Sequence, residues 1–319
     1  MIRYVVRRIL WLIPVIIAVS FIVFLLMELA PGTVVDAIQS DDMTTEQREE
    51  LRRQYNLDKP MIYRYGLYML NFAQGDLGVS QVSKLDVWDV FMTRLPNTLI
   101  LSFSSLIIGS AVSIPLGIFA ARRAGKLADN AVTIFSLTGM SMPIFWLGLL
   151  LLLMFSYKLG LFPGGGNREG IRSIVLPAIC GSLGMIANTA RQTRSNMLEV
   201  LNADFLRTAR AKGVPEKVVI RKHALGNAWI PILTTIGIGL AAQLAGSVVI
   251  ESVFAWPGIG RLAVEAVTQR DVTLVTGVVI MKSILYVLVQ LIVDLLYAFA
   301  DPRIKAQYIK YAKRRKRVV

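Results

Sequence analysis

Six apolar runs follow one another along the chain, separated by short polar stretches. Each run is long enough to cross a lipid bilayer as a helix, which takes roughly 20 residues. Five of them contain no charged residue, and the sixth carries Lys282 and Asp294. The runs are 9–27, 95–121, 130–157, 173–190, 224–250 and 272–300. The pattern predicts an all-α polytopic membrane protein with six transmembrane helices.

The polar segment between the first two runs predicts two short helices outside the membrane. Thr44–Gln47 has the form of a capping box, which opens a helix over 45–55, and Lys59-Pro60 ends that helix. An amphipathic helix follows over 61–73. It carries the aromatic residues Tyr63, Tyr65, Tyr68 and Phe72. These side chains lie either at the membrane interface or against the outer ends of the transmembrane helices.

The net charge of +14 is divided unevenly between the two sides of the predicted membrane. One side sums to +17 and the other to −3. The positive side comprises 1–8, 122–129, 191–223 and 301–319. Cytoplasmic loops carry such an excess of Lys and Arg. We therefore expect both termini in the cytoplasm and loops 31–94 and 251–271 outside, and the charge indicates topology rather than nucleic-acid binding. The polybasic end, Lys313–Arg317, is typical of a contact with anionic lipids.

Arg3, Arg7 and Arg8 before the first apolar run also fit a signal peptide. The run is longer than the apolar part of a signal peptide, and no Ala-x-Ala cleavage pattern follows it. We expect a retained first helix.

Nothing in the sequence indicates bond chemistry in this chain. The single cysteine, Cys180, lies in an apolar run, and the single histidine, His223, lies among basic residues. Gly125-Lys126 is followed by Leu127, so the chain has no phosphate-binding loop of the nucleotide-hydrolase type. We predict no catalytic residue, no metal site and no cofactor in this chain.

The stretch 202–229 predicts a basic helix–turn–helix between the fourth and fifth runs. Asn202 is a candidate cap for a helix from Ala203 to Lys212, and Gly213 is the expected stop. Pro215 suits the first turn of a second helix. Such an element on the charged side of a membrane protein is suited to docking a partner.

At this point the sequence resembles the membrane subunits of ATP-binding-cassette (ABC) importers. Ala209, Gly213 and Leu225 fit the register of their cytoplasmic signature. The chain departs from this signature at Arg207, Thr208, His223 and Gly226. The motif R-T-A-R-A-K-G is nevertheless similar to that of the peptide and nickel branch. Three further phrases are similar to that branch, at 75–80, 251–260 and 294–303.

The resemblance implies a MetI-like type I importer permease in the inner membrane of a prokaryote. It implies four partners: a homologous permease as the other half of a heterodimer, two cytoplasmic ATPase subunits that hold ATP and Mg, and an external substrate-binding protein. The chain would form half of an alternating-access pathway for di- or oligopeptides or a related small solute. The substrate itself is left open among dipeptides, oligopeptides, a nickel chelate, glutathione and oligosaccharides.

The first helix of the docking element is the predicted ATPase-coupling site. Phe205 and Leu206 are the expected apolar anchors, with Arg207, Arg210 and Lys212 as charged contacts. The complete predicted site is Asp204, Phe205, Leu206, Arg207, Thr208, Ala209, Arg210, Ala211, Lys212 and Gly213.

Polar and aromatic residues within or beside the spans are candidates for the pathway and its gate. They are Ser141, Asn188, Gln243, Glu251, Phe254, Trp256 and Lys282. Each has a structural alternative: a static kink at Ser141-Met142-Pro143, hydrogen bonds between helices for Asn188 and Gln243, and snorkelling to the outer surface for Lys282. Pro115 and Pro143 are expected to interrupt their helices. Pro257-Gly258 predicts a turn that folds back at the outer mouth.

We divide the chain into an anchor helix with an outer segment, 1–94, and a five-helix core, 95–302. The core contains the coupling loop 191–225, and a basic tail follows over 303–319. Two other functions stay open. One is a secondary transporter or channel that works alone, and the docking helix argues against it. The other is a membrane-anchored scaffold, against which the polar residues in the spans count.

Overall fold

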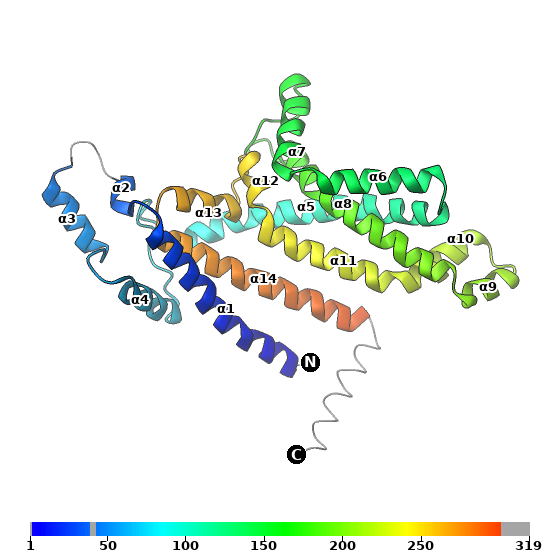
Figure 1. Cartoon of the computed structure of the whole chain (residues 1–319), viewed down its shortest axis with the longest axis horizontal. Coiled ribbons are helices and arrows are strands. Elements are labelled where there is room, and N and C mark those ends of the chain that lie inside the picture. The colour runs from blue at the N-terminus through cyan, green and yellow to red at the C-terminus, as the bar shows by residue number, and fades with distance from the viewer. Residues whose placement is uncertain (1, 39–42, 301–319) are drawn as a thin grey trace, which may run out of the picture. The chain divides into compact units, whose positions relative to one another are not determined.

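The computed structural model describes residues 2–38 and 43–300, and within them the chain is helical apart from its connections and one isolated antiparallel bridge, Val79 to Asp86. The predicted tail, 303–319, lies outside the described residues. From the first helix to the start of the second long one, the elements are α1 (Ile2–Leu29), α2 (Val34–Ile38), α3 (Thr45–Gln54), α4 (Met61–Ala73) and α5 (Val87–Arg122) (Figure 1).

The middle of the chain contains α6 (Leu127–Ser141), α7 (Ile144–Leu151), the π-helix η1 (Leu152–Lys158), α8 (Ile171–Leu201) and α9 (Asp204–Ala211). The remainder contains α10 (Glu216–Val218), the π-helix η2 (Val219–Ala224), α11 (Leu225–Gly246), α12 (Val248–Val253), α13 (Ile259–Thr268) and α14 (Val272–Ala300). Helix α14 has the predicted bounds of the sixth apolar run.

These helices form two compact units, each with its own core. Unit 1 contains residues 100–254 and the described part of 289–319. Unit 2 contains residues 2–99 and 255–288. The units do not follow the boundary that we placed between residues 94 and 95, because two long helices, α5 and α14, each belong partly to one unit and partly to the other. The division into 1–94 and 95–302 therefore stays a prediction.

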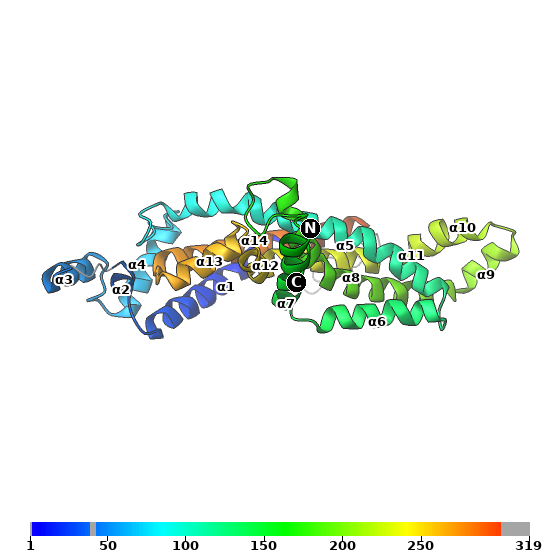
Figure 2. The same cartoon turned by 90° about the horizontal axis from the view of Figure 1, so that it is seen from above.

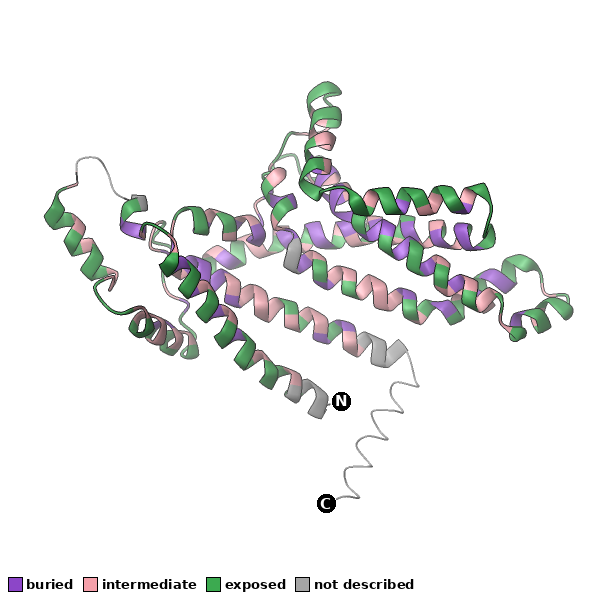
Figure 3. Ribbon diagram, viewed as in Figure 1, coloured by how far each residue is buried: buried purple, intermediate pink, exposed green. Residues whose placement is uncertain are grey.

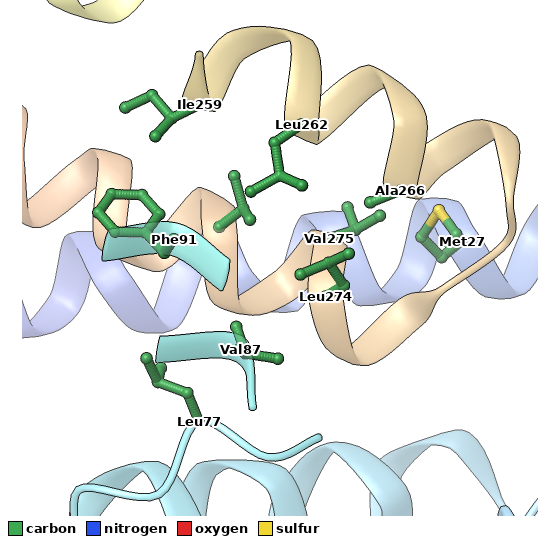
Figure 4. Packing of buried hydrophobic residues seen from close by; sticks show 10 residues of the cluster. Met27, Leu77, Val87, Phe91, Ile259, Leu262, Ala266, Leu274 and Val275 are labelled. Carbon is green, nitrogen blue, oxygen red and sulfur yellow. The ribbon is translucent and has the colours of Figure 1, made fainter. Parts of the chain in front are cut away.

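The core of unit 2 joins the beginning of α5 to α13 and α14. Val87 and Phe91 of α5 lie beside Ile259 and Leu262 of α13, and the start of α14 completes the cluster (Figure 4). Glycine permits the closest approach, since a Cβ at Gly277 would lie 2.5 Å from a methyl group of Val87. Residues far apart in sequence therefore share one core.

A buried carboxylate, Asp271, fixes the beginning of α14 in unit 2. It accepts a hydrogen bond from the Leu274 amide at 2.9 Å, as an N-terminal cap does. It also accepts the hydroxyl of Ser80 at 2.6 Å and the amide of Val82 at 3.2 Å. Asp271 thus attaches the loop before α5 to the first turn of α14.

The outer helices α3 and α4 confirm the sequence pattern closely. Thr44 and Gln47 form the predicted capping box, although α3 ends at Gln54, before Lys59-Pro60. In α4, Tyr65 stacks edge-on against Phe24 of α1, and its hydroxyl lies 3.0 Å from that of Ser20. Tyr68 and Phe72 also pack inward, whereas Tyr63 is exposed. Three of the four aromatic residues thus pack against helices of the same unit.

In unit 1, helix α8 is surrounded by α6, α7, α11 and α12. Figure 3 shows buried positions along much of α8. Its contact with α5 is tight, because a Cβ at Gly117 would lie 2.6 Å from the carbonyl oxygen of Ala190 and 2.5 Å from Thr193. The centre of this unit is therefore a helix lined by small and hydroxyl side chains.

The third predicted span is broken. Helices α6 and α7–η1 meet at an angle of 101°, and α7 points away from α6 in Figure 1. Met142 adopts an extended conformation, as a residue before proline prefers, and Pro143 then begins α7. The described chain thus holds five helices long enough to span a membrane, or six when the bent pair counts as one span.

The other predicted interruption, at Pro115, is wrong, since α5 continues through it from Val87 to Arg122. Gly226, which departs from the importer signature, lies inside a helix. The chain is helical without a break from Glu216 to Gly246, with η2 as a π-helical insertion between α10 and α11.

Candidate functional site

The predicted coupling helix is α9, a short helix that follows α8 directly. Together with α10 it lies at the far end of α8 and α11 (Figures 1 and 2). It runs from Asp204 to Ala211, one residue shorter at each end than the sequence predicts. Our assignment of Asn202 as its cap is wrong, because Asn202 has α-helical backbone angles and ends α8. Ala203 occupies the capping position and makes no side-chain hydrogen bond there.

The predicted stop at Gly213 is confirmed. Gly213 has φ +75°, in the left-handed region that favours glycine. Its amide donates to the Arg210 carbonyl at 2.9 Å, and the Val214 amide donates to the Ala209 carbonyl at 3.3 Å. These two bonds form a Schellman motif, and the side chains of Val214 and Ala209 both pack against the same apolar cluster. The local sequence therefore defines the end of α9 and the turn into α10.

Helix α9 has one buried and one exposed face. Leu206 is fully buried in a cluster with Met197, Val219 and Ile232 of the same unit. The preceding residue, Phe205, is 47% exposed. Our expectation that Leu206 contacts a partner is therefore wrong: Leu206 fastens α9 to its own chain. Ala209 is half-buried, and the exposed predicted coupling residues are Asp204, Phe205, Arg207, Thr208, Arg210, Ala211, Lys212 and Gly213.

A two-pronged ion pair closes the turn between α9 and α10. The guanidinium of Arg210 donates from Nε and Nη2 to the two carboxylate oxygens of Glu216, both at 3.1 Å. This hydrogen bonding raises the pKa of Arg210 above its usual value. On the exposed face, Arg207 lies 3.6 Å from the carboxylate of Asp204. Arg210 thus links α9 to α10 across the turn, while Arg207 and Lys212 are both exposed.

Sequence reasoning missed a second ion pair, between Asp129 at the start of α6 and Arg194 of α8. Two nitrogens of Arg194 bind the two oxygens of Asp129, one of them at 2.6 Å. Asp129 is buried, and it also accepts the Gly125 amide at 2.9 Å. The pair joins the α5–α6 turn to α8 shortly before α9. The available signal was a lone acidic residue just after the basic turn 122–126.

The outer turn begins in unit 1 with two buried side chains. Glu251 accepts the hydroxyl of Ser247 at 2.7 Å. Phe254 lies against α7, where a Cβ at Gly148 would come within 3.2 Å of its ring. The carbonyl of Phe254 accepts the Gly166 amide at 2.9 Å. Phe254 therefore connects the end of α12 to α7 and to the loop after η1.

Trp256 belongs to unit 2 and is buried there as well. Its indole nitrogen donates to the Asn97 carbonyl at 2.9 Å, and the Asn97 amide donates to the Pro257 carbonyl at 3.0 Å. The left-handed residue of the turn is Ala255, with φ +48°, whereas Gly258 precedes α13 in an extended conformation. The predicted fold-back thus contains a helix, α13, that the sequence reading did not include.

The remaining pathway candidates lie in different surroundings. Gln243 of α11 donates to the Gly181 carbonyl of α8 at 2.5 Å, so the predicted hydrogen bond between helices is present. Asn188 is exposed, Lys282 is half-buried, and Ser141 donates back to the Leu137 carbonyl at 2.9 Å. Asp294 accepts a hydrogen bond from Gln290 at 3.2 Å.

The sequence matches two family models along nearly its whole length. Residues 113–306 match the model described as binding-protein-dependent transport system inner membrane component, and residues 1–102 match the corresponding N-terminal model. The chain belongs to this family. It is a permease component of a binding-protein-dependent transport system and not an enzyme. Membership also decides against a transporter or channel that works alone.

Curated relatives of full length support the assignment. The oligopeptide transport system permease protein AppB of Bacillus subtilis is 39% identical and covers 96% of this chain and 100% of its own. The di/tripeptide permease DppB of Pseudomonas aeruginosa is 37% identical, with 96% and 100% covered. The glutathione permease GsiC of Escherichia coli is 37% identical, with 96% and 99% covered.

Solved structures agree on the fold. The methionine ABC transporter MetNI in an inward-facing conformation matches with a TM-score of 0.57 at 20% identity, over 66% of this chain and 96% of that chain. An amino acid ABC transporter crystallised with histidines matches with a TM-score of 0.51 at 18% identity, over 66% and 94%. The predicted all-α, MetI-like permease fold is confirmed.

Proposed function

We propose that this chain forms one half of the membrane pathway of an ATP-driven importer of peptides, with α9 as its contact to an ATPase subunit. The observation that carries the proposal is the division of α9 into two faces. Leu206 is buried in the chain's own core, while its two neighbours, Phe205 and Arg207, are exposed on either flank of the helix. A helix that exposes a large aromatic ring beside mobile charges is suited to bind a groove in a partner.

Movement of α9 has a rigid route into the membrane. Leu206 packs on the end of α8 and on η2, and the Arg210–Glu216 pair closes the turn to α10. The Asp129–Arg194 pair links the same end of α8 to α6. A force on Phe205 is therefore carried to three helices at once, as an ATPase-driven change between inward-open and outward-open states requires.

The proposed substrates are peptides, and the proposed partners are those implied by the family. The relatives named above carry oligopeptides, di- and tripeptides and glutathione, which all contain peptide-like amide bonds. The partners are a homologous permease, two ATPase subunits with ATP and Mg, and an external binding protein. The charge division of +17 against −3 supports a cytoplasmic position for both termini and α9.

The polar stripe of α8 is our candidate for the pathway wall. Most of the apolar window of α8 is buried within the chain, yet Gly184, Asn188, Gln192 and Ser195 are exposed at helical spacing. A polar stripe on a transmembrane helix faces water or a partner rather than lipid. Asn188 would then line the pathway, while Gln243 holds α11 against α8.

The test of the coupling role is Phe205→Ser in the assembled transporter, reconstituted with its binding protein. We expect a loss of about tenfold or more in peptide-stimulated ATP hydrolysis and in uptake of a labelled tripeptide, the effect of truncating a central aromatic anchor. The variant should insert and assemble with an unchanged melting temperature, because the ring is exposed.

The matched control is Leu127→Ser, which removes an 87% exposed apolar side chain on the same proposed side of the membrane. It should leave hydrolysis and uptake unchanged. Normal coupling in Phe205→Ser would refute α9 as the contact. Uptake of free amino acids but not of di- or tripeptides by the native transporter would refute the substrate and leave the coupling result intact.

A further inference from the structure

An open groove of ≈ 740 Å³ lies in unit 1 between the end of α5 and the start of the fifth span. Three cationic side chains line it, namely Arg122 of α5, Lys217 of α10 and Arg221 of η2. Its other walls are apolar and include Ile118, Phe119 and Leu225. The groove therefore combines positively charged residues with an apolar surface.

The groove sits where two membrane-spanning helices end. The candidate span of α5 ends at Arg122, and the next candidate span that lines the groove begins at Glu216. A lipid headgroup lies at this depth, with its acyl chains alongside the apolar part of the helices. The cations of the groove lie at the ends of the spans, where a phospholipid has its charged headgroup. The apolar residues Ile118 and Pro115 lie one to two turns further inward, where the acyl chains begin.

The charge of the groove is strongly one-sided. No carboxylate is among its lining residues. The carboxylate closest in sequence, Glu216, feels the charge of Arg122 but is bound by both prongs of Arg210. A fourth cation stands next to the groove, because the guanidinium of Arg123 stacks over the ring of Phe119 at 4.3 Å. An occupant must therefore bring negative charge.

We propose that this groove binds one anionic phospholipid, with the phosphate held by Arg122, Lys217 and Arg221 and an acyl chain along Ile118, Phe119 and Leu225. Basic pockets between transmembrane helices bind anionic headgroups in this way. A bound lipid would lie between α5 and α10, next to the turn that joins α9 to α10, because α10 begins only three residues after Gly213. The site thus makes the environment of the coupling turn sensitive to membrane composition.

The experiment uses the complete transporter in nanodiscs of phosphatidylcholine and phosphatidylglycerol mixed one to one, with retained lipids identified by native mass spectrometry. The native complex should retain phosphatidylglycerol in preference to phosphatidylcholine. Arg122→Ala/Lys217→Ala/Arg221→Ala should lower that preference about fivefold or more, since each cation near the membrane surface contributes about that factor. The charge-conserving Arg122→Lys/Arg221→Lys should keep it.

The control variant, Lys126→Ala/Arg191→Ala/Lys222→Ala, removes the same charge from exposed residues outside the groove and should leave the preference unchanged. An equal loss in this variant would show a diffuse surface effect and overturn the proposal. So would an unchanged preference in the groove variant.

Two other occupants are separated by additional measurements. Inorganic phosphate at millimolar concentration should not displace the retained lipid, because it lacks an acyl chain; displacement would indicate a site for free anions. The variant Lys217→Cys should react with a lipid-soluble maleimide in the assembled transporter and should not cross-link to another subunit. Cross-linking in high yield would assign the groove to a protein partner.

Discussion

Helices α1 and α8 are both long enough to cross a membrane, but they differ in how much of each is buried within the chain. In α1, 17% of the most apolar window is buried within the chain, and large aliphatic side chains such as Leu10 and Leu26 are exposed. In α8 the buried share is 67%. Figure 3 shows exposed positions along α1 and buried positions along α8. The helix with the more apolar sequence is the one that is less buried within the chain.

The physical reason is that lipid tails are as apolar as leucine, so burying apolar area drives helix packing much less than in water. Packing in α8 depends on close approach instead. Its buried side chains include Ser173, Ser182, Thr189 and Thr193. Small and hydroxyl side chains let the backbones of neighbouring helices come near one another. Mean hydropathy therefore identifies the helices that can span a membrane, but it does not identify which of them is most buried within the chain.

The largest effect that bears on this comparison is expected for Gly117→Ala, which adds a Cβ 2.6 Å from the Ala190 carbonyl and 2.5 Å from Thr193 of α8. Backbone must shift to make room, so we expect a loss of about 3 kcal/mol or more in stability and little assembled protein. Thermal melting of the complex in detergent measures it. Gly184→Ala on α8 itself is the control, since nothing lies within 4 Å of that Cβ. Equal tolerance of both changes would mean that α8 is not held by close packing.

A matched pair of leucine truncations sharpens the comparison. Leu176 of α8 is 2% exposed and Leu26 of α1 is 60% exposed. Leu176→Ala should cost about 2 kcal/mol, mostly as a cavity that neighbouring helices do not fill. Leu26→Ala should cost close to nothing, because lipid fills the space. Denaturation in mild detergent compares the two. A larger loss for Leu26→Ala would reverse the roles of the helices.

The smallest expected effect separates hydroxyl groups with and without partners. The Ser20 hydroxyl of α1 donates to the Ile17 carbonyl and meets the Tyr65 hydroxyl at 3.0 Å, so Ser20→Ala should cost about 1 kcal/mol. The buried Thr193 hydroxyl of α8 has no hydrogen-bond partner among the described residues, so Thr193→Val should change stability by less than about 0.5 kcal/mol. Melting temperatures of the two variants provide the readout. A substantial loss in Thr193→Val would reveal a partner for that hydroxyl in the assembled transporter.

Local sequence signals predicted the features that depend on local interactions alone. The capping box at Thr44–Gln47 and the left-handed stop at Gly213 are confirmed, and so are the bounds of α4 and α14. Each depends on backbone conformation and hydrogen bonds within a few residues, or on a long apolar run, and these are properties of a single segment.

Errors arose wherever two segments compete or meet. Asn202 is a good N-cap by type, but it ends α8 instead, with helical backbone angles. Pro115 leaves α5 intact, while Pro143 breaks its span, and the two prolines look alike in sequence. Leu206 and Phe205 are adjacent apolar residues, and only packing decides that the first is buried and the second exposed.

The sequence by itself therefore determined the class of protein, its family, the number of apolar runs, the charge division and the place of the coupling turn. The tertiary structure decided which residues of that turn face outward, that Asp129 pairs with Arg194, and that Arg122 meets Lys217 and Arg221 around one groove. These last contacts join residues 65 to about 100 positions apart. A chain specifies such contacts only through the packing of whole helices, because no local pattern records which helix faces will meet.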